Sequence, residues 1–284
     1  MNEIKETNIF KKIYKSKKTI AAAKRIIIAI LLCVMTFSIA KTITYYEQQA
    51  ESNQMQSDII HDHVTPDDSQ SEAPVVPEED ISDTPDTDED APVDEYTPDP
   101  ETINVDFDTL TAKYPDVVGY IYGANTKIQY PIAYTSSSND YYLNRDLDGN
   151  LNANGSIFIE HLNAPDFSDQ NTILYGHHMR SGLMFAGLVK YKDASYYSAH
   201  PYFYIYTPAQ NYRLDLFAGF VCAHDDEVFA LSLSQDQLAN MAAKSTFKSN
   251  IDIPTGNLVT LCTCSYEFNN ARYVVVGELV PLDS

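Results

Sequence analysis

A cysteine and an arginine near the C-terminal end carry side chains suited to cysteine acyl transfer. Cys264 ends a strongly β-forming run that begins at Leu258, and a second β-forming run follows Asn269-Asn270. Read as a β-hairpin, this pattern places Cys264 opposite Arg272 on the neighbouring strand. A permanent cation beside a thiol favours the thiolate and stabilises a developing oxyanion. On the hairpin alone, a packed core cysteine with a surface arginine is an equally good interpretation.

A histidine after another predicted strand offers the group needed to protonate a leaving amine. The run 172–175 is followed by Gly176, His177 and His178. An imidazole titrates near neutral pH, and at a strand end it is both positioned and exposed. The other histidines lack this setting. We predict surface or structural positions for His161, His200 and His224, and His61 and His63 fall in an acidic segment.

Metal binding is disfavoured by the spacing of the candidate ligands. Segment 146–150 opens like a calcium loop, but Leu151 stands where that loop requires Gly and Ile157 where it requires Glu. The adjacent histidines His177 and His178 are poor chelating partners, and their spacing from the cysteine matches no usual zinc site. We therefore expect no metal and no cofactor.

Short strands are predicted to position these residues, and clusters of Asn, Asp, Gly and Pro separate the strands. Repeated short strands with such turn signals favour an antiparallel barrel or sandwich. Helices are predicted at 105–114, 184–190 and 234–246, the last with a capping box formed by Ser234 and Gln237. The predicted strands are 117–122, 127–131, 156–160, 172–175, 202–207, 211–221, 258–263 and 273–279.

Charge is distributed very unevenly along the chain. Residues 1–41 carry nine Lys or Arg against two Glu, and residues 42–101 carry nineteen acidic residues and no Lys or Arg. The remainder has ten basic against nineteen acidic residues, and the whole chain has a formal charge of -21. Nucleic acid is thus excluded as a partner of the folded part, because no clustered basic surface is visible there.

An apolar run at 26–40 predicts a membrane anchor. Flanking residues with long or interfacial side chains extend it to a span of roughly 20–43, with a basic cytoplasmic tail at 1–19 and everything after Lys41 outside the cell. The alternative is a cleaved signal peptide, for which Ser38-Ile39-Ala40 is a weak cleavage site. Cys33 is interpreted as an apolar membrane residue.

Residues 44–102 are interpreted as an acidic, disordered stalk. This stretch is dense in Asp, Glu, Pro, Ser and Thr and has few large apolar residues, so it cannot bury enough surface to offset the entropy of ordering. A solvated spacer is favoured over a binding segment. The folded domain is predicted to occupy 103–284.

Four segments of the chain form a joint pattern: the Thr-Leu-x-Thr-Cys run with Arg272 downstream, the Tyr-Gly-His-x-Met run, Asn139 to Asn144, and Gly155 to Phe158. Together, over roughly residues 103–281, they resemble the class B sortases. The resemblance implies a mainly β fold: a closed barrel of about eight strands, with N-terminal helical elements and a helix inserted before the penultimate strand. It also implies that this helix, 234–246, helps to form the substrate groove.

By the same resemblance, Cys264 is the nucleophile, His177 the acid/base and Arg272 the oxyanion-stabilising group, while His178 occupies a variable position and receives no role. The implied enzyme is a cysteine transpeptidase, grouped with thiol peptidases. It cleaves a C-terminal sorting signal after Thr and joins the acyl group to an amine of peptidoglycan. Its partners are surface proteins that bear such a signal, the wall precursor or cross-bridge amine, and the membrane.

Some features depart from this family or leave its function open. Cys262 stands at a position where Ser is common in the family. It is interpreted as either a packed thiol or a redox-active one. A disulfide with Cys264 is not expected, because two residues this close along one strand cannot comfortably form the bond. Glu160-His161 replaces an Asp-Tyr-like pair. Alternative functions are pilin polymerisation onto a lysine amine, a non-catalytic wall-binding module, and a hydrolytic cysteine protease.

Overall fold

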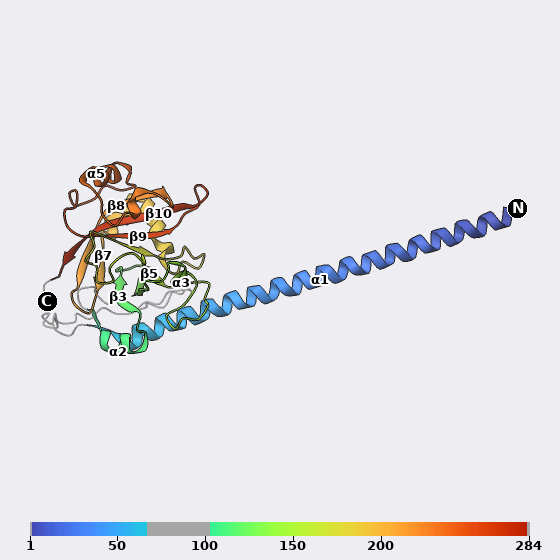
Figure 1. Cartoon of the computed structure of the whole chain (residues 1–284), viewed down its shortest axis with the longest axis horizontal. Coiled ribbons are helices and arrows are strands. Elements are labelled where there is room, and N and C mark those ends of the chain that lie inside the picture. Colours follow the sequence, from blue (N-terminus) through green and yellow to red (C-terminus); the bar gives the residue numbers. More distant parts are fainter. Residues whose placement is uncertain (1, 67–102, 283–284) are drawn as a thin grey trace, which may run out of the picture. The chain divides into compact units, whose positions relative to one another are not determined.

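The computed structural model describes residues 2–66 and 103–282, with side chains described from Lys24 onward. The chain divides into two compact units, residues 1–51 and residues 52–284. Helix α1, Asn2–His63, contributes residues to both units (Figure 1). Each unit is considered separately below.

The first unit is helical, and its apolar side chains are exposed. Large side chains from Ile26 to Ile43 face outward along α1. A helix satisfies its own backbone hydrogen bonds, so a long helix with exposed apolar side chains is suited to the interior of a bilayer. Within the described residues, one helix is long and apolar enough to cross a membrane. This is compatible with the single-pass anchor predicted at 20–43.

The second unit includes the C-terminal end of α1 and a short strand pair, which is a correction to the predicted stalk. Ile59 on α1 is buried beside Ile103 and Val105. Strand β1 (Val64–Pro66) pairs antiparallel with β2 (Ile103–Val105). Residues 52–66 are therefore ordered, because a few apolar residues at helical spacing make a buried face that the acidic composition conceals. Residues 67–102 of the predicted stalk lie outside the described residues.

The predicted closed barrel is confirmed, with eight strands in the order β10-β8-β7-β3-β4-β5-β6-β9. The strands lie within a few residues of their predicted limits. They are β3 (Val117–Tyr122), β4 (Gln129–Ala133), β5 (Ile157–Ile159), β6 (Asn171–Tyr175), β7 (Tyr202–Tyr206), β8 (Tyr212–Ala223), β9 (Leu258–Cys264) and β10 (Ala271–Pro281).

The barrel is mixed, which corrects the antiparallel arrangement favoured by the strand pattern. β4 pairs parallel with β5, and β6 pairs parallel with β9. Parallel neighbours need a long crossover connection. The segment between β6 and β9 is long enough to contain β7 and β8. This crossover brings the end of β6 beside the end of β9.

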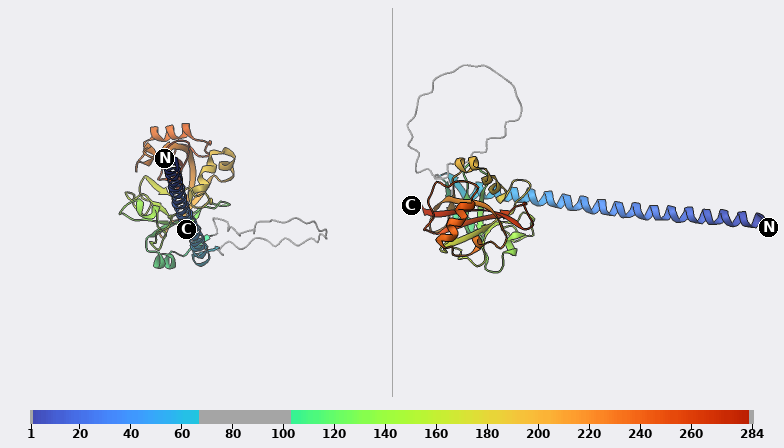
Figure 2. Two further views of the ribbon diagram at one scale, coloured as in Figure 1. Left: turned by 90° about the vertical axis from the view of Figure 1, so that its right-hand side faces the viewer. Right: turned by 90° about the horizontal axis from the view of Figure 1, so that it is seen from above.

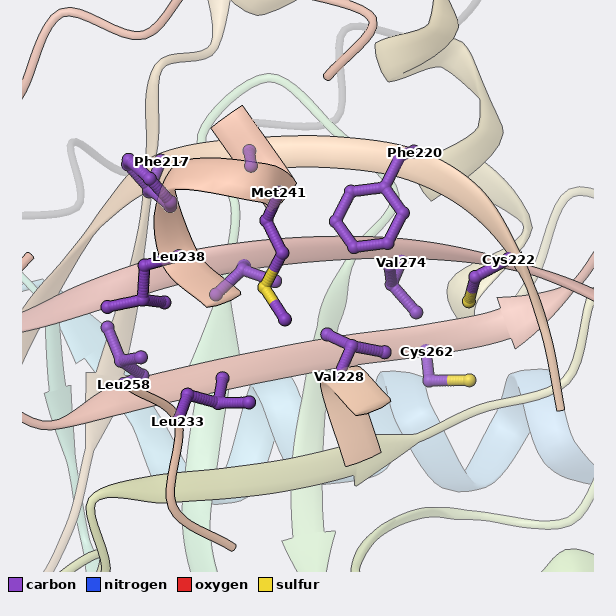
Figure 3. Packing of buried hydrophobic residues seen from close by; sticks show 12 residues of the cluster. Phe217, Phe220, Cys222, Val228, Leu233, Leu238, Met241, Leu258, Cys262 and Val274 are labelled. Atoms are coloured by element: carbon purple, nitrogen blue, oxygen red, sulfur yellow. The ribbon is translucent and has the colours of Figure 1, made fainter. Parts of the chain in front are cut away.

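Helical elements surround the barrel. The inserted helix α5 begins with the predicted capping box of Ser234 and Gln237. Its Leu238 and Met241 pack with Phe220 of β8 (Figure 3). α5 and α2 lie at opposite ends of the second unit in Figure 1 and in the left view of Figure 2. The helical elements of this unit beyond α1 are α2 (Phe107–Lys113), α3 (Asp140–Leu143), α4 (Ala194–Ala199), α5 (Gln235–Lys244) and the 3-10 helices η3 (Phe185–Lys192) and η4 (Glu227–Phe229).

Candidate active site

The hairpin of β9 and β10 places Cys264 opposite Arg272, as the sequence predicted. The two are Cα partners in the antiparallel register. Ser265 N donates to Ala271 O at 2.9 Å, just beyond the pair. This pattern makes Cys264 and Arg272 a non-hydrogen-bonded pair, the kind in which facing side chains approach most closely. The guanidinium donates to Ala271 O at 3.1 Å, which uses one of its five N–H donors.

His177 lies two residues beyond the end of β6, and the intervening Gly176 makes this position possible. A Cβ atom on Gly176 would lie 2.4 Å from Ile157 Cδ1 and 2.8 Å from the Phe185 ring, so the turn into the loop has room for glycine alone. The ring of His177 contacts the main chain of α3, with Nε2 2.7 Å from Leu143 O. Because a carbonyl oxygen only accepts, Nε2 carries a proton in this contact.

One pocket of about 240 Å³ brings the three predicted site residues together. Cys264, His177 and Arg272 all line it, from β9, from the loop after β6 and from β10. A thiol, an imidazole and a guanidinium around one cavity supply a nucleophile, an acid/base and an oxyanion donor. The wall also includes Asn139, Leu143, Phe158, Tyr175, Gly176, His224, Phe229, Cys262 and Thr263.

A buried carboxylate supports the wall of this pocket. Glu160 is 9% exposed and accepts hydrogen bonds from Asn139 Nδ2 at 2.6 Å and from the Tyr175 hydroxyl at 2.9 Å. Its second oxygen lies 2.6 Å from His161 Nδ1, without a hydrogen-bonding angle. Burial, and then the charge of Glu160, raise the pKa of Tyr175, so its hydroxyl remains a donor at neutral pH. The departure noted at Glu160-His161 therefore adjoins the site.

Burial distinguishes the three cysteines of the barrel. Cys222, Cys262 and Cys264 are all free thiols. Burial raises the pKa of Cys222 to about 12 and that of Cys262 well above its ordinary value. Both belong to the apolar cluster under α5 (Figure 3). Of the two interpretations of Cys262, the structure favours a packed thiol, because a buried thiol stays protonated and inert. Cys264, at the end of its strand, is partly exposed.

Two histidines reach the site in ways that the sequence analysis missed. His178 Nδ1 lies 2.9 Å from the carbonyl oxygen of Cys264. His224, predicted to be a surface or structural residue, lines the pocket from the connection that follows β8. The adjacency of His178 to His177 was visible in the sequence. The position of His224 depends on the closure of the barrel and left no local signal.

The connection between β8 and β9 lines the pocket through a different helix from the one expected, which was 234–246. Phe229 of η4 lines it and stacks on Tyr175, with ring centroids 6.3 Å apart. Over the described part of the chain, the lining takes no residue from α5. The connection after β8 thus shapes the pocket through η4, while α5 packs against the outside of β8.

The segment considered as a calcium loop is closed by its own hydrogen bonds. Asn150 N donates to the carboxylate of Asp146 at 2.9 Å, and Asp146 N donates to Asn150 O at 3.1 Å. Burial raises the pKa of Asp146. In the parts of the chain that the structure describes, no group of three His, Cys, Asp or Glu side chains is placed to hold a metal ion.

Comparison with known proteins agrees with this fold. A family model described as the sortase domain matches residues 125–280. Sortase B of Listeria monocytogenes is 34% identical over 199 residues, which cover 65% of this chain and 80% of that protein. Sortase B of Staphylococcus aureus is 29% identical over 63% of this chain and 77% of its own length.

A solved Staphylococcus aureus sortase B–substrate complex superimposes with a TM-score of 0.59 and 28% identity, covering 63% of this chain and 86% of that one. The region matched by the family model contains the barrel strands from β4 onward and all the residues that line the pocket described above. The family model covers more than half of this chain, and the relatives are class B enzymes. The chain therefore belongs to the sortase family of cysteine transpeptidases, in its class B branch.

Proposed function

We propose that this chain is a cell-surface transpeptidase that cleaves a C-terminal sorting signal after Thr and transfers the acyl group to an amine of peptidoglycan. The observation that carries the proposal is the meeting of Cys264, His177 and Arg272 at one pocket. A solved substrate complex of Staphylococcus aureus sortase B, a relative of the same class, supports a substrate of the same kind here.

In the first step, the Cys264 thiolate attacks the carbonyl carbon of the peptide bond that follows Thr. The C–N bond breaks, a thioester forms, and protonated His177 gives its proton to the departing amine. Arg272 donates hydrogen bonds to the oxyanion of the tetrahedral intermediate. His177 has to leave the carbonyl of Leu143, because Nε2–H is engaged there at 2.7 Å.

In the second step, an incoming amine attacks the thioester and the C–S bond breaks. His177 takes the proton that the amine loses, and Cys264 leaves as the thiolate. Arg272 stabilises the second oxyanion in the same way. A new amide bond results, and the free enzyme is restored.

The anchor places this chemistry at the membrane surface. We propose that the helix at 20–43 crosses the membrane once, with residues 1–19 in the cytoplasm and the barrel outside the cell. The nine basic residues among the first forty-one and the exposed apolar side chains of α1 support this orientation.

The test is the intact mass of the full-length chain in detergent after incubation with a panel of sorting-type peptides. The expected result is a mass gain equal to the N-terminal peptide fragment, lost on adding hydroxylamine, an amine that cleaves thioesters. Cys264→Ala is the control that must show no gain. A chain that forms no adduct and cleaves no peptide of the panel would favour the wall-binding module. Adducts that turn over equally fast with and without an added amine would favour a hydrolase.

A further inference from the structure

The parallel ladder between β6 and β9 ends just before the nucleophile. Tyr175 is opposite Cys262, and Gly176 N donates to Cys262 O at 3.1 Å as the last backbone bond of the ladder. Alternate residues of a strand point their carbonyls to the same edge, so Cys264 O faces the side of β6 as well. The chain after Gly176 has already turned into a loop, and no β6 backbone N–H pairs with Cys264 O in this ladder.

The imidazole of His178 occupies the place of that missing donor. His178 Nδ1 lies 2.9 Å from Cys264 O. The acceptor is a carbonyl, so Nδ1 carries the proton and donates. The same ring packs against Tyr266, with centroids 5.3 Å apart, two residues beyond the nucleophile. His178 therefore contacts both the backbone of Cys264 and the loop that follows it.

A second set of contacts holds this loop from the other side. Ser265 donates from its hydroxyl to Glu267 at 2.5 Å, and Lys192 of η3 donates to Ser265 at 3.0 Å and pairs with Glu267. The peptide group between Cys264 and Ser265 is thus fixed by its neighbours on both edges. Cys264 O is bonded to His178, and Ser265 N is bonded to Ala271 O. These two bonds oppose a backbone rotation at Cys264 that would swing its Sγ atom away from Arg272.

We propose that His178 is a positioning residue for the transpeptidation reaction: its Nδ1–H continues the β6–β9 ladder through a side chain and aims the Cys264 thiol at the bound carbonyl. This inference rests on the proposed function. It assigns His178 no contact with substrate. The donor is present in both the neutral Nδ1–H tautomer and the imidazolium form of the ring.

The experiment compares three variants of His178 in the full-length chain. His178→Asn places an N–H where Nδ1 stands, His178→Gln places it where Nε2 stands, and His178→Phe keeps a ring against Tyr266 without a donor. A fourth variant, Tyr266→Ala, removes the ring contact alone. For each we measure the maximal rate of acyl-enzyme formation, the peptide concentration at half-maximal rate, and the unfolding midpoint.

The expected result is a maximal acylation rate about tenfold lower in His178→Phe and His178→Gln, the loss of one net hydrogen bond. His178→Asn is expected to stay within about twofold of the wild type, and all variants to keep the half-maximal peptide concentration. Equal rates in Asn and Gln variants, or an unchanged rate in the Phe variant, would overturn the inference. If the His178→Phe variant does not fold, the comparison of His178→Asn with His178→Gln still tests the inference. A wild-type chain that forms no acyl-enzyme would instead overturn the proposed function.

If the wild-type chain forms no acyl-enzyme, the rate of Cys264 alkylation by iodoacetamide tests the positioning role of His178 by itself. The Asn variant is expected to match the wild-type pH profile of alkylation, and the Gln variant to deviate from it. Identical profiles for the Asn and Gln variants would overturn the positioning inference without reference to any peptide.

Discussion

Cys264 and Arg272 face each other as a non-hydrogen-bonded pair at the end of the β9–β10 hairpin. On its other side, Arg272 is the register partner of Cys222 on β8. Along the sheet, Arg272 therefore has Cys264 as its partner on one neighbouring strand and Cys222 on the other. The order of the strands thus gives Arg272 one partly exposed and one buried cysteine as neighbours.

Replacing Arg272 is expected to reduce acylation far more than it reduces stability. Arg272→Ala removes an oxyanion donor, and the expected loss in acylation rate is about 100-fold or more. Arg272→Lys keeps a charge but not the planar fork, so it is expected to recover only part of the rate. The check is single-turnover acyl-enzyme formation followed by mass. Arg213→Ala, an arginine of β8 outside the pocket, is the control and is expected to retain the wild-type rate. Equal losses in Arg272→Ala and Arg213→Ala would contradict the assigned role.

Thiol reagents are expected to modify Cys264 and to spare Cys222 and Cys262. Burial raises the pKa of both latter thiols, so they remain protonated and shielded at pH 8. The measurement is peptide mapping after brief exposure to iodoacetamide, with Cys33→Ala as the background to remove the exposed thiol of α1. Rapid labelling of Cys262 in the folded chain would favour the interpretation of Cys262 as a redox-active thiol.

Gly176 is expected to tolerate no side chain. Gly176→Ala brings a methyl group 2.4 Å from Ile157 Cδ1, and such overpacking costs about 1–3 kcal/mol. The expected result is a lower free energy of unfolding together with slower acylation, because His177 shifts with the strand end. Ile157→Val removes the Cδ1 atom, so the double variant is expected to regain part of both losses. Losses that simply add in the double variant would show that this contact is not the cause.

Removing the carboxylate of Glu160 is expected to destabilise the pocket wall. Glu160→Ala leaves Asn139 Nδ2 and the Tyr175 hydroxyl, both in partly buried residues, without their acceptor, at a cost of at most about 1–3 kcal/mol for each donor. Glu160→Gln keeps one carbonyl acceptor in place and is expected to lose less. Chemical denaturation measures both variants. Asp252→Asn, an exposed carboxylate, is the control expected to leave stability unchanged.

The stability of the loop after Cys264 is expected to depend on acid pH through Glu267. The hydrogen bond from Lys192, and then that from Ser265, lower the pKa of Glu267 to about 2. Its contribution is therefore complete above its ordinary pKa of 4.5 and is lost as the pH falls from there through about 2. The difference in unfolding midpoint between wild type and Glu267→Gln is expected to shrink over this interval. It is expected to be small, since the pair is partly exposed. A difference that stays constant from pH 6 to pH 2.5 would argue against this ion pair.

The sequence by itself determined the parts of the site that depend on neighbours along the chain. The hairpin places Cys264 and Arg272 together because they are only eight residues apart, and alternating strand geometry then sets which side chains face each other. The strand–glycine–histidine pattern placed His177 on a loop for the same local reason. The capping box of Ser234 and Gln237 is equally local, and it begins α5 where expected.

Tertiary structure decided everything that joins distant segments. The parallel pairing of β6 with β9 brings residues 171–175 beside residues 258–262, although the segment 176–257 separates them in the sequence. Strand propensity does not specify which distant strands become partners. The contact of His178 with Cys264 and the attachment of Glu160 to Asn139 and Tyr175 follow from that pairing and from barrel closure. The ordered residues 52–66 likewise depend on a partner surface, because their few apolar side chains are buried only against the barrel domain.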